Sequence, residues 1–426
     1  MTVRVVITGL GVVAPNAVGL ADFEAALREG RSGIRHIPAM AELGFGCQVA
    51  GVPPLPEDVI ASHFTEIERR AMNSSHLYAS IAALEAWADA GLPKPHPDDD
   101  AVHWDTGAVI GTGIGGMDTI VDRLVDQVRA GKVRRLGTTL VEQIMASGVS
   151  ARVAGLLGLG NQVTSNSSAC TTGTEAVVEA SRTIRNRLAT RMLAGASEGA
   201  SIFTWAGFDS MRVLMRKSND APERASRPLS ASAGGFVPGS GAGMLVLESL
   251  DTARARGARI YGEVLGGAVN CGGQRMGGSM TSPNPTGMLR CIRAAIAEAG
   301  VAPREIDVIN GHLTATGADP NEMNVWGAAL ERPPGQFPLV TATKSMIGHA
   351  LGAAGAIECV GAMLMLHRRF VHPCRNCEDL HPEVAAYAEA IPQEMRPVPS
   401  LNVLAKAGFG FGDVNAAIIL RRWEGE

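Results

Sequence analysis

Strand-like and helix-like patterns alternate along the whole chain, and this alternation constrains the fold more than any other feature of the sequence. Short apolar runs at residues 3–7, 191–195 and 306–309 are predicted to be strands, and stretches such as 20–28 and 288–299 have helical spacing of apolar residues. Alternation of this kind favours mixed sheets covered by helices. It recurs in both halves, with no linker-like stretch between them. We predict an α/β fold of two closely packed halves, residues 1–255 and 256–426.

Three further segments carry specific expectations. Residues 67–90 are predicted to form one long amphipathic helix, and residues 138–157 are predicted to be mostly helical. Residues 408–412 alternate glycine and phenylalanine. Their amides could bind a developing oxyanion, or the segment could be a flexible turn with two core phenylalanines. The motif alone favours the turn.

Composition excludes several classes of protein. The chain has 426 residues, of which 46% are hydrophobic, so it can bury a large core. A net charge of −4 and a pI near 6.2 argue against nucleic acid as a general partner. No apolar run is long enough to span a membrane, and the N-terminus reads as a strand, not as a signal peptide. The cysteines are odd in number and scattered, which indicates a reducing cytoplasm without a disulfide framework.

One cysteine stands at the start of a helical pattern. A short polar approach, residues 164–169, leads to Cys170, after which apolar residues recur at helical spacing as far as residue 188. The positive end of the helix dipole and the unpaired N–H groups there would lower the pKa of the thiol and favour the nucleophilic thiolate. The alternative is an inert buried thiol, and the local sequence leaves both readings open.

Two histidines and a lysine directly follow predicted strands. His312 comes after the strand at 306–309, and Lys344 and His349 come after a strand at 339–342. Open α/β sheets bind their ligands at the carboxyl ends of strands. A lone histidine is more often structural, but these three side chains together with Cys170 favour a catalytic site.

For two further motifs, the sequence favours a structural role over a binding or redox site. Gly111, Gly113 and Gly116 fit the dinucleotide-binding GxGxxG pattern, but no acidic residue follows at the position of a ribose partner. A tight turn bordering an active site is better supported. Cys374 and Cys377 form a single CxxC pair with no evident further ligands, so we expect neither a zinc site nor a redox site there.

Four motifs, in this order, resemble those of the elongating β-ketoacyl-acyl carrier protein synthases, the type I and II enzymes with a Cys-His-His site. They lie at residues 168–173, 310–316, 343–355 and 408–412. Residues 6–11 and 226–228 also fit, so the resemblance covers essentially the whole chain. It implies a thiolase-like fold, a five-layered αβαβα sandwich made of two similar βαβ halves. The first half would carry the nucleophile and the second the two histidines, and the protein would be a dimer.

The resemblance also implies roles for the catalytic residues. Cys170 would accept an acyl chain from the phosphopantetheine arm of acyl carrier protein, and the amides of Cys170 and Phe409 would bind the oxyanion. His312 and His349 would stabilise the enolate that forms when malonyl-acyl carrier protein loses carbon dioxide. Lys344 would set the charge and geometry of the site. The enolate would attack the Cys170 thioester in a Claisen condensation that gives 3-oxoacyl-acyl carrier protein, without a metal or organic cofactor.

Further residues would handle the substrate and the carrier protein. The predicted substrate-binding residues are Ile114, which would limit the depth of the acyl pocket, Thr314 and Thr316, which would position the pantetheine arm, and Phe411; Phe409 matches the gate that opens on acylation. Because acyl carrier protein is acidic, a basic surface would dock it. The candidates are Arg129, Lys132, Arg134 and Arg135, followed by Arg69 and Arg70. A solvated charged face is the alternative reading.

The sequence departs from the family pattern at three places. Leu313 stands where a glycine usually follows the histidine, residues 231–235 lack an Arg-Asp-Gly element, and Asp413 replaces part of a Gly-Gly-Thr-Asn run. The first and last alter the lining near the catalytic centre. They favour a specialised synthase of polyketide or aryl-polyene-like assembly over housekeeping fatty acid synthesis.

Two rival functions stay open. A thiolase would condense without decarboxylation, but it needs a second cysteine near the C-terminus, and none follows Cys377. A chain-length-factor-like protein would be the non-catalytic partner of a ketosynthase heterodimer, but such partners lack the nucleophile. The sequence distinguishes neither homodimer from heterodimer nor one acyl chain length from another.

Overall fold

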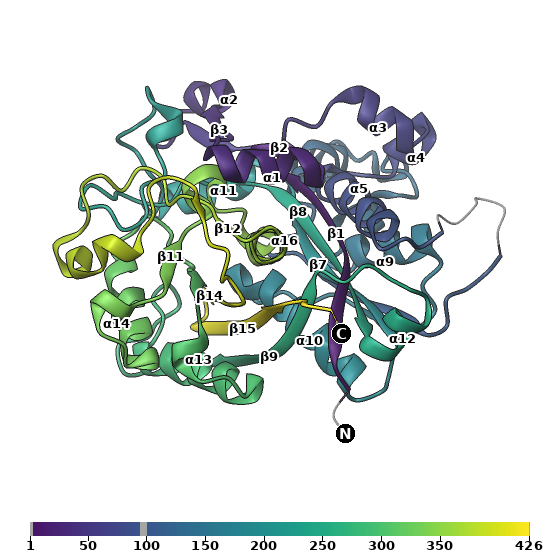
Figure 1. The fold of residues 1–426 in the computed structure, drawn as a ribbon. Helices are drawn as coiled ribbons and strands as arrows, with labels where there is room; N and C mark the ends of the chain where they lie inside the picture. The colour runs from purple at the N-terminus through teal and green to yellow at the C-terminus, as the bar shows by residue number, and fades with distance from the viewer. Residues whose placement is uncertain (1–2, 94–99, 426) are drawn as a thin grey trace.

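One 11-stranded sheet dominates the computed structural model, which describes residues 3–93 and 100–425 (Figure 1). Its strands follow the order β11-β10-β14-β15-β9-β1-β8-β7-β5-β6, with β2 paired to β1. The strands of the first half are β1 (Val5–Ala14), β2 (Ala17–Val18), β5 (Thr106–Gly111), β6 (Val163–Thr164), β7 (Arg191–Glu198) and β8 (Gly241–Ser249). Those of the second half are β9 (Gly262–Cys271), β10 (Val308–Asn310), β11 (Leu339–Thr341), β14 (Val403–Gly410) and β15 (Val414–Arg422).

The two halves share one topology. From its outer edge, each half-sheet places its third, second, fourth, fifth and first strands in that order: β6-β5-β7-β8-β1 and β11-β10-β14-β15-β9. In each, the three outer strands are parallel and the remaining pairings are antiparallel. The half-sheets join where β1 pairs with β9 over a short antiparallel stretch. The fold is therefore a repeat of one unit, as predicted, although the two halves lack obvious sequence identity. The boundary after residue 255 stays a prediction.

Helices form three layers around these half-sheets. The central layer is α10 (Thr172–Arg185) and α16 (Ala354–Arg368), which pack against each other between the half-sheets. The outer layers are α5 (Ser74–Asp89) with α9 (Gly148–Leu157) on the first half, and α13 (Pro285–Ala299) with α14 (Asp319–Leu330) on the second. Strand alternation explains the layering, because on β8 Leu245 and Leu247 pack in the central core while Met244 and Val246 pack in an outer one. The predicted five-layered αβαβα sandwich is confirmed.

The remaining elements are short. The shorter helices include α1 (Leu20–Glu29), α2 (Pro38–Glu42), α3 (Glu57–His63), α4 (Glu66–Arg70), α6 (Met117–Thr119), α7 (Asp126–Arg129), α8 (Leu140–Ile144), α11 (Ile202–Ser210), α12 (Leu250–Ala255) and α15 (Lys344–Ile347). Two small sheets pair β3 (Ile34–His36) with β4 (Val49–Gly51) and β12 (Phe370–Val371) with β13 (Arg396–Pro397). Within the described ranges, no helix combines the length and the hydrophobicity needed to cross a membrane.

Three local predictions need correction. Residues 67–90 form two helices, α4 and α5, because the side chain of Asn73 accepts the N–H of His76 and starts a new helix. The helical stretch at 138–157 is likewise divided into α8 and α9. The segment 408–412 is not simply a turn, since β14 extends through Gly410 and only residues 411–413 turn into β15.

Candidate active site

Cys170 lies in a short 3-10 turn directly before α10. The preceding residue, Ala169, has a φ of 49°, so the chain bends sharply there and the small side chain tolerates the bend. The hydroxyl of Thr172 fixes the bend, since it accepts the N–H of Ser168 at 2.9 Å and donates to the carbonyl of Ala169 at 2.7 Å. Gly173 lets α10 approach α16, because a Cβ at this position would lie 2.3 Å from the backbone nitrogen of Ala356.

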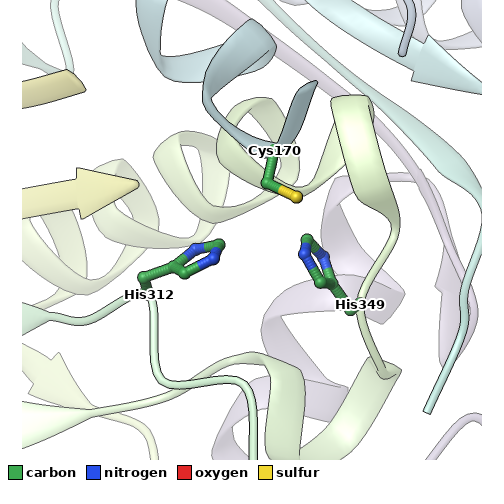
Figure 2. Close-up of side chains that lie close together, drawn as sticks. All are labelled: Cys170, His312 and His349. Atoms are coloured by element: carbon green, nitrogen blue, oxygen red, sulfur yellow. The ribbon is translucent and has the colours of Figure 1, made fainter. Parts of the chain in front are cut away.

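The structure brings Cys170 together with both predicted histidines, although they come from opposite halves of the chain (Figure 2). The sulfur of Cys170 and a ring nitrogen of each histidine lie within 4.8 Å of one another. His312 follows β10 and His349 follows α15, and their ring centroids are 5.3 Å apart with the planes nearly perpendicular. A ligand atom at the centre of this triangle could contact all three side chains.

Burial decides the protonation states of these groups. It raises the pKa of the Cys170 thiol to about 11, although the charge of Lys344 and the backbone N–H of Phe411 oppose the rise. We expected a lowered pKa from the helix N-terminus, and the structure reverses that expectation because desolvation disfavours the thiolate. Burial, followed by the charge of Lys344, also holds the pKa values of His312 and His349 well below 6.5. Both imidazoles are therefore neutral at pH 7, and neither ring nitrogen of His349 bonds to any part of the chain that the structure describes.

These side chains open into one cavity of about 210 Å³. Its lining includes the predicted substrate-binding residues Thr314, Thr316 and Phe411, and the predicted gate Phe409. The hydroxyl oxygens of the two threonines are 3.0 Å apart. The backbone N–H of Phe411 interacts with the sulfur of Cys170. The ring centroid of Phe409 lies 6.1 Å from that of His312 with the planes nearly perpendicular, and the oxyanion role of the Phe409 amide stays a prediction.

Two predicted site residues lie outside the cavity lining. The side chain of Ile114 is 44% exposed on the first half. Lys344 is buried outside the cavity lining and its ammonium donates to Glu358; its charge contributes to the low pKa values of His312 and His349. Gly113, from the glycine cluster, packs against a buried carboxylate: Glu198 accepts the N–H groups of Gly113 at 2.8 Å and of Gly352 at 3.0 Å. This carboxylate ties a turn of the first half to the segment that follows His349.

None of the predicted docking residues lines the cavity. Arg129, Lys132, Arg134 and Arg135 are exposed and make no ion pair with any residue in the described ranges. Arg69 pairs with Glu57, and Arg70 lies 4.0 Å from Glu66, so much of the charge of this second group is already balanced.

Sequence reasoning missed several buried charged residues around the site. Glu322 accepts the backbone N–H of His312 at 2.7 Å and thereby fixes the turn after β10. Glu198 holds the glycine turn, and Glu358 and Lys406 pair behind the histidines. The available signal was a lone charge in an apolar run, as with Glu358 inside α16 and Lys406 inside β14. A charge in a buried element needs a partner, and that requirement marks both residues.

Comparison with known proteins identifies the family. The sequence matches the profile "Beta-ketoacyl synthase, N-terminal domain" over residues 2–253 and "Beta-ketoacyl synthase, C-terminal domain" over residues 261–378. The chain belongs to the β-ketoacyl synthase family. It is 36% identical to 3-oxoacyl-[acyl-carrier-protein] synthase 2 of Rhizobium meliloti, over 99% of both chains. The predicted family is thus confirmed.

Solved structures of ketosynthases have the same fold. The ishigamide ketosynthase/chain length factor superposes with a TM-score of 0.88 at 30% identity, covering 99% of this chain and 100% of the other. A type II polyketide synthase acyl-carrier protein in complex with its ketosynthase bound to the hexaketide gives a TM-score of 0.87 at 29% identity, covering 100% of each chain.

Proposed function

We propose that this chain condenses an acyl group held on Cys170 with malonyl-acyl carrier protein, with loss of carbon dioxide, to give 3-oxoacyl-acyl carrier protein. The observation that carries the proposal is the meeting of one thiol and two neutral imidazoles at the end of a single cavity. Membership of the β-ketoacyl synthase family supports the same reaction, since the Rhizobium meliloti relative is named for it.

The first half-reaction loads the cysteine. The sulfur of Cys170 attacks the carbonyl carbon of an acyl-carrier protein thioester, a C–S bond forms, and the pantetheine thiol leaves. Because the Cys170 pKa is about 11, the thiol is protonated at pH 7 and its proton must move during attack. We propose that the neutral imidazole of His349, with a ring nitrogen within 4.8 Å of the sulfur, accepts this proton and returns it to the leaving thiolate. We propose that the amide of Cys170 binds the oxyanion together with that of Phe411, whose N–H interacts with the Cys170 sulfur.

The second half-reaction forms the new carbon–carbon bond. The bond between C2 and the carboxylate of the malonyl group breaks, carbon dioxide leaves, and the electron pair moves to the thioester oxygen as an enolate. Neutral imidazoles at His312 and His349 donate hydrogen bonds to that oxygen without supplying an acidic proton that would quench the carbanion. The carbanion attacks the Cys170 thioester, the C–S bond breaks and the 3-oxoacyl product is released. The sulfur leaves as a thiolate and takes a proton from solvent, because its pKa is about 11.

We propose that the reaction needs no metal ion or organic cofactor. Cys170, His312 and His349 are spaced closely enough to ligate a metal, but metal-bound imidazole nitrogens could not donate to the enolate. Treatment with a chelator should therefore leave the condensation rate unchanged. Thr314 and Thr316, whose paired hydroxyls line the cavity, are proposed to position the pantetheine arm.

The proposed partner is acyl carrier protein, docked on the surface formed by Arg129, Lys132, Arg134 and Arg135. The solved complex of a ketosynthase with its acyl-carrier protein supports such a partner. We propose a cytoplasmic homodimer, in which a second copy would cover the exposed side chain of Ile114. A heterodimer with a chain-length-factor-like partner is the alternative, and the ketosynthase/chain length factor relative favours testing it.

A glutamine at the nucleophile tests the reaction. Cys170→Gln should abolish acyl transfer, because the sulfur is lost, yet still decarboxylate malonyl-acyl carrier protein, because both imidazoles remain. The matched control is Cys271→Gln, which replaces an exposed thiol and should retain both activities. Wild-type protein that decarboxylates no malonyl-acyl carrier protein would contradict the mechanism.

A thiol reagent separates the enzyme from an inactive partner. Wild-type protein treated with cerulenin should gain one adduct, located on the Cys170 peptide by mass spectrometry. A chain-length-factor-like role predicts no adduct at that position.

A further inference from the structure

Three charged side chains share one buried site behind the histidines. Lys344 from α15 and Glu358 from α16 are each 1% exposed, and Lys406 from β14 is 0% exposed. One oxygen of Glu358 accepts from the ammonium of Lys344, and the other lies 2.7 Å from the ammonium of Lys406. The ammonium of Lys406 also donates to the carbonyl of Ala407. The cluster holds two positive charges and one negative charge.

Strand geometry explains how Lys406 reaches this position. Side chains alternate along β14, so Leu404 and Lys406 face the central layer with α16, whereas Ala405 and Ala407 face the outer core. In the sheet register, Lys406 lies opposite Asn310, two residues before His312. The lysine is therefore fixed by its strand directly behind the catalytic segment.

The surplus positive charge has no second carboxylate to balance it. In the described ranges, neither lysine forms an ion pair with a carboxylate other than Glu358. The other titratable groups around the site are Glu198, Asp319, Glu322, Cys359 and His372. The first three carboxylates accept backbone N–H groups, and burial raises their pKa values, in Glu322 to about 7 and in Asp319 to about 6. Glu322 offsets part of the charge of Lys344, but in the described ranges none of the three forms an ion pair with either lysine.

The catalytic groups experience this charge. After burial, the charge of Lys344 and then that of Lys406 keep the pKa of His349 low, and Lys406 contributes to the low pKa of His312 as well. At Cys170 the charge of Lys344 opposes the rise in pKa that burial causes, whereas Glu358 adds to that rise. Whatever neutralises Glu358 therefore strengthens the effect of Lys344 on the thiol.

We propose that Lys406 is a positioning residue of the condensing reaction, an internal cation that neutralises Glu358 so that the charge of Lys344 acts in full on Cys170 and the two imidazoles. Its effect on the reaction rate rests on the condensing function proposed above. Its effect on the reactivity of the Cys170 thiol does not depend on that function, so the charge effect and the condensing function can fail separately. Lys406 is not among the residues that line the cavity, and its ammonium pairs with Glu358.

The first test measures the reactivity of Cys170 without any substrate. Lys406→Met keeps a side chain of similar length and removes the charge, Lys406→Arg keeps the charge, and Leu404→Met is the packing control on the same face of β14. Iodoacetamide alkylation is followed at pH 8 on the Cys170 peptide, with the exposed Cys271 as the reference thiol. The rate is proportional to the thiolate fraction, so a rise of one unit in the thiol pKa slows it about tenfold.

We expect alkylation of Cys170 in Lys406→Met to be slower by about tenfold or more, and alkylation in Lys406→Arg and Leu404→Met to match wild type within about twofold. In condensation assays, Lys406→Met should lower kcat and leave KM nearly unchanged, because the residue does not contact substrate. Wild-type alkylation rates in folded Lys406→Met would overturn the proposal. If Lys406→Met does not fold, Lys406→Arg decides, since loss of alkylation despite a retained charge would also overturn it.

Chemical rescue provides the second test. Lys406→Ala leaves a space beside Glu358 into which a small cation fits, and methylammonium should restore alkylation of Cys170 in a concentration-dependent manner. Tetramethylammonium, which has no N–H group, should not. Equal rescue by both ions, or by neither, would contradict a role for the ammonium group. If alkylation responds as expected but wild type neither condenses nor decarboxylates, the condensing function fails and the charge effect stands.

Discussion

Replacing Glu358 with glutamine should destabilise the protein strongly and make its stability depend on pH. The substitution keeps the shape of the side chain but leaves two ammonium groups, on Lys344 and Lys406, without a buried counter-charge. Breaking a buried ion pair by removing one partner costs about 3–5 kcal/mol. A second estimate agrees: if one lysine instead loses its proton at pH 7, about 3.4 units below its usual pKa, the cost is about 5 kcal/mol.

The sign of the pH dependence follows from proton binding. A buried lysine that is neutral in the folded variant regains its proton on unfolding, so the unfolded state binds more protons and stability rises with pH. The rise should be about 1.4 kcal/mol per pH unit until the usual lysine pKa near 10.4. In wild type, burial alone would raise the pKa of Glu358, but the charges of Lys344 and Lys406 hold it below its usual value. That carboxylate therefore contributes stability at neutral pH, which is lost as the pH falls through its low folded-state pKa.

Urea unfolding at pH 7 and pH 9 measures both effects. Glu331→Gln is the matched control, because Glu331 pairs with Arg293 at the surface with its side chain 77% exposed, and such pairs contribute at most about 1 kcal/mol. We expect Glu358→Gln to lose about 3–5 kcal/mol at pH 7 and to regain about 2–3 kcal/mol at pH 9. A variant within about 1 kcal/mol of wild type at pH 7, with no gain at pH 9, would refute the assigned charge states.

Three further predictions follow from individual contacts. Gly173→Ala should lower the free energy of unfolding by about 1–3 kcal/mol, because its Cβ would lie 2.3 Å from the backbone of Ala356. In thermal denaturation the control Gly207→Ala, which has open space around its Cβ, should be neutral or stabilising. Equal effects at both sites would contradict this packing. Asp413 accepts the N–H groups of Gln274 at 2.8 Å and of Asn284 at 2.7 Å. Asp413→Asn leaves one of these N–H groups unpaired, so hydrogen exchange should become faster in residues 272–284 and stay unchanged in α10. Unaltered exchange in residues 272–284 would count against these hydrogen bonds. The double variant Arg134→Glu, Arg135→Glu should raise KM for the carrier-protein substrate, because the docking surface loses its positive charge. Its kcat/KM for a free pantetheine thioester, which does not dock, should stay unchanged. An equal loss of kcat/KM on both substrates would exclude a docking role.

Local pattern and motif carried much of the prediction. The alternation of strands and helices gave the layered α/β class, because apolar periodicity reflects which face of each element is buried. The ordered motifs around Cys170, His312 and His349 gave the family, and their positions at element ends indicated where they would meet. The helix break at Asn73 was also readable, since an asparagine before a helical stretch is a common cap. It was missed because the apolar periodicity runs on across the break.

Other properties arise only when distant segments pack together. The pKa of Cys170 depends on how far tertiary packing removes the thiol from solvent, and burial outweighs the local helix terminus that the sequence displays. The choice of Phe411 as the amide facing the sulfur depends on where β14 ends relative to α10. Lys406 and Glu358 lie on different elements, and neither local sequence identifies the other residue as the ion-pair partner. Electrostatic interactions depend on three-dimensional distance and on desolvation, whereas periodicity and motifs report only on neighbours along the chain.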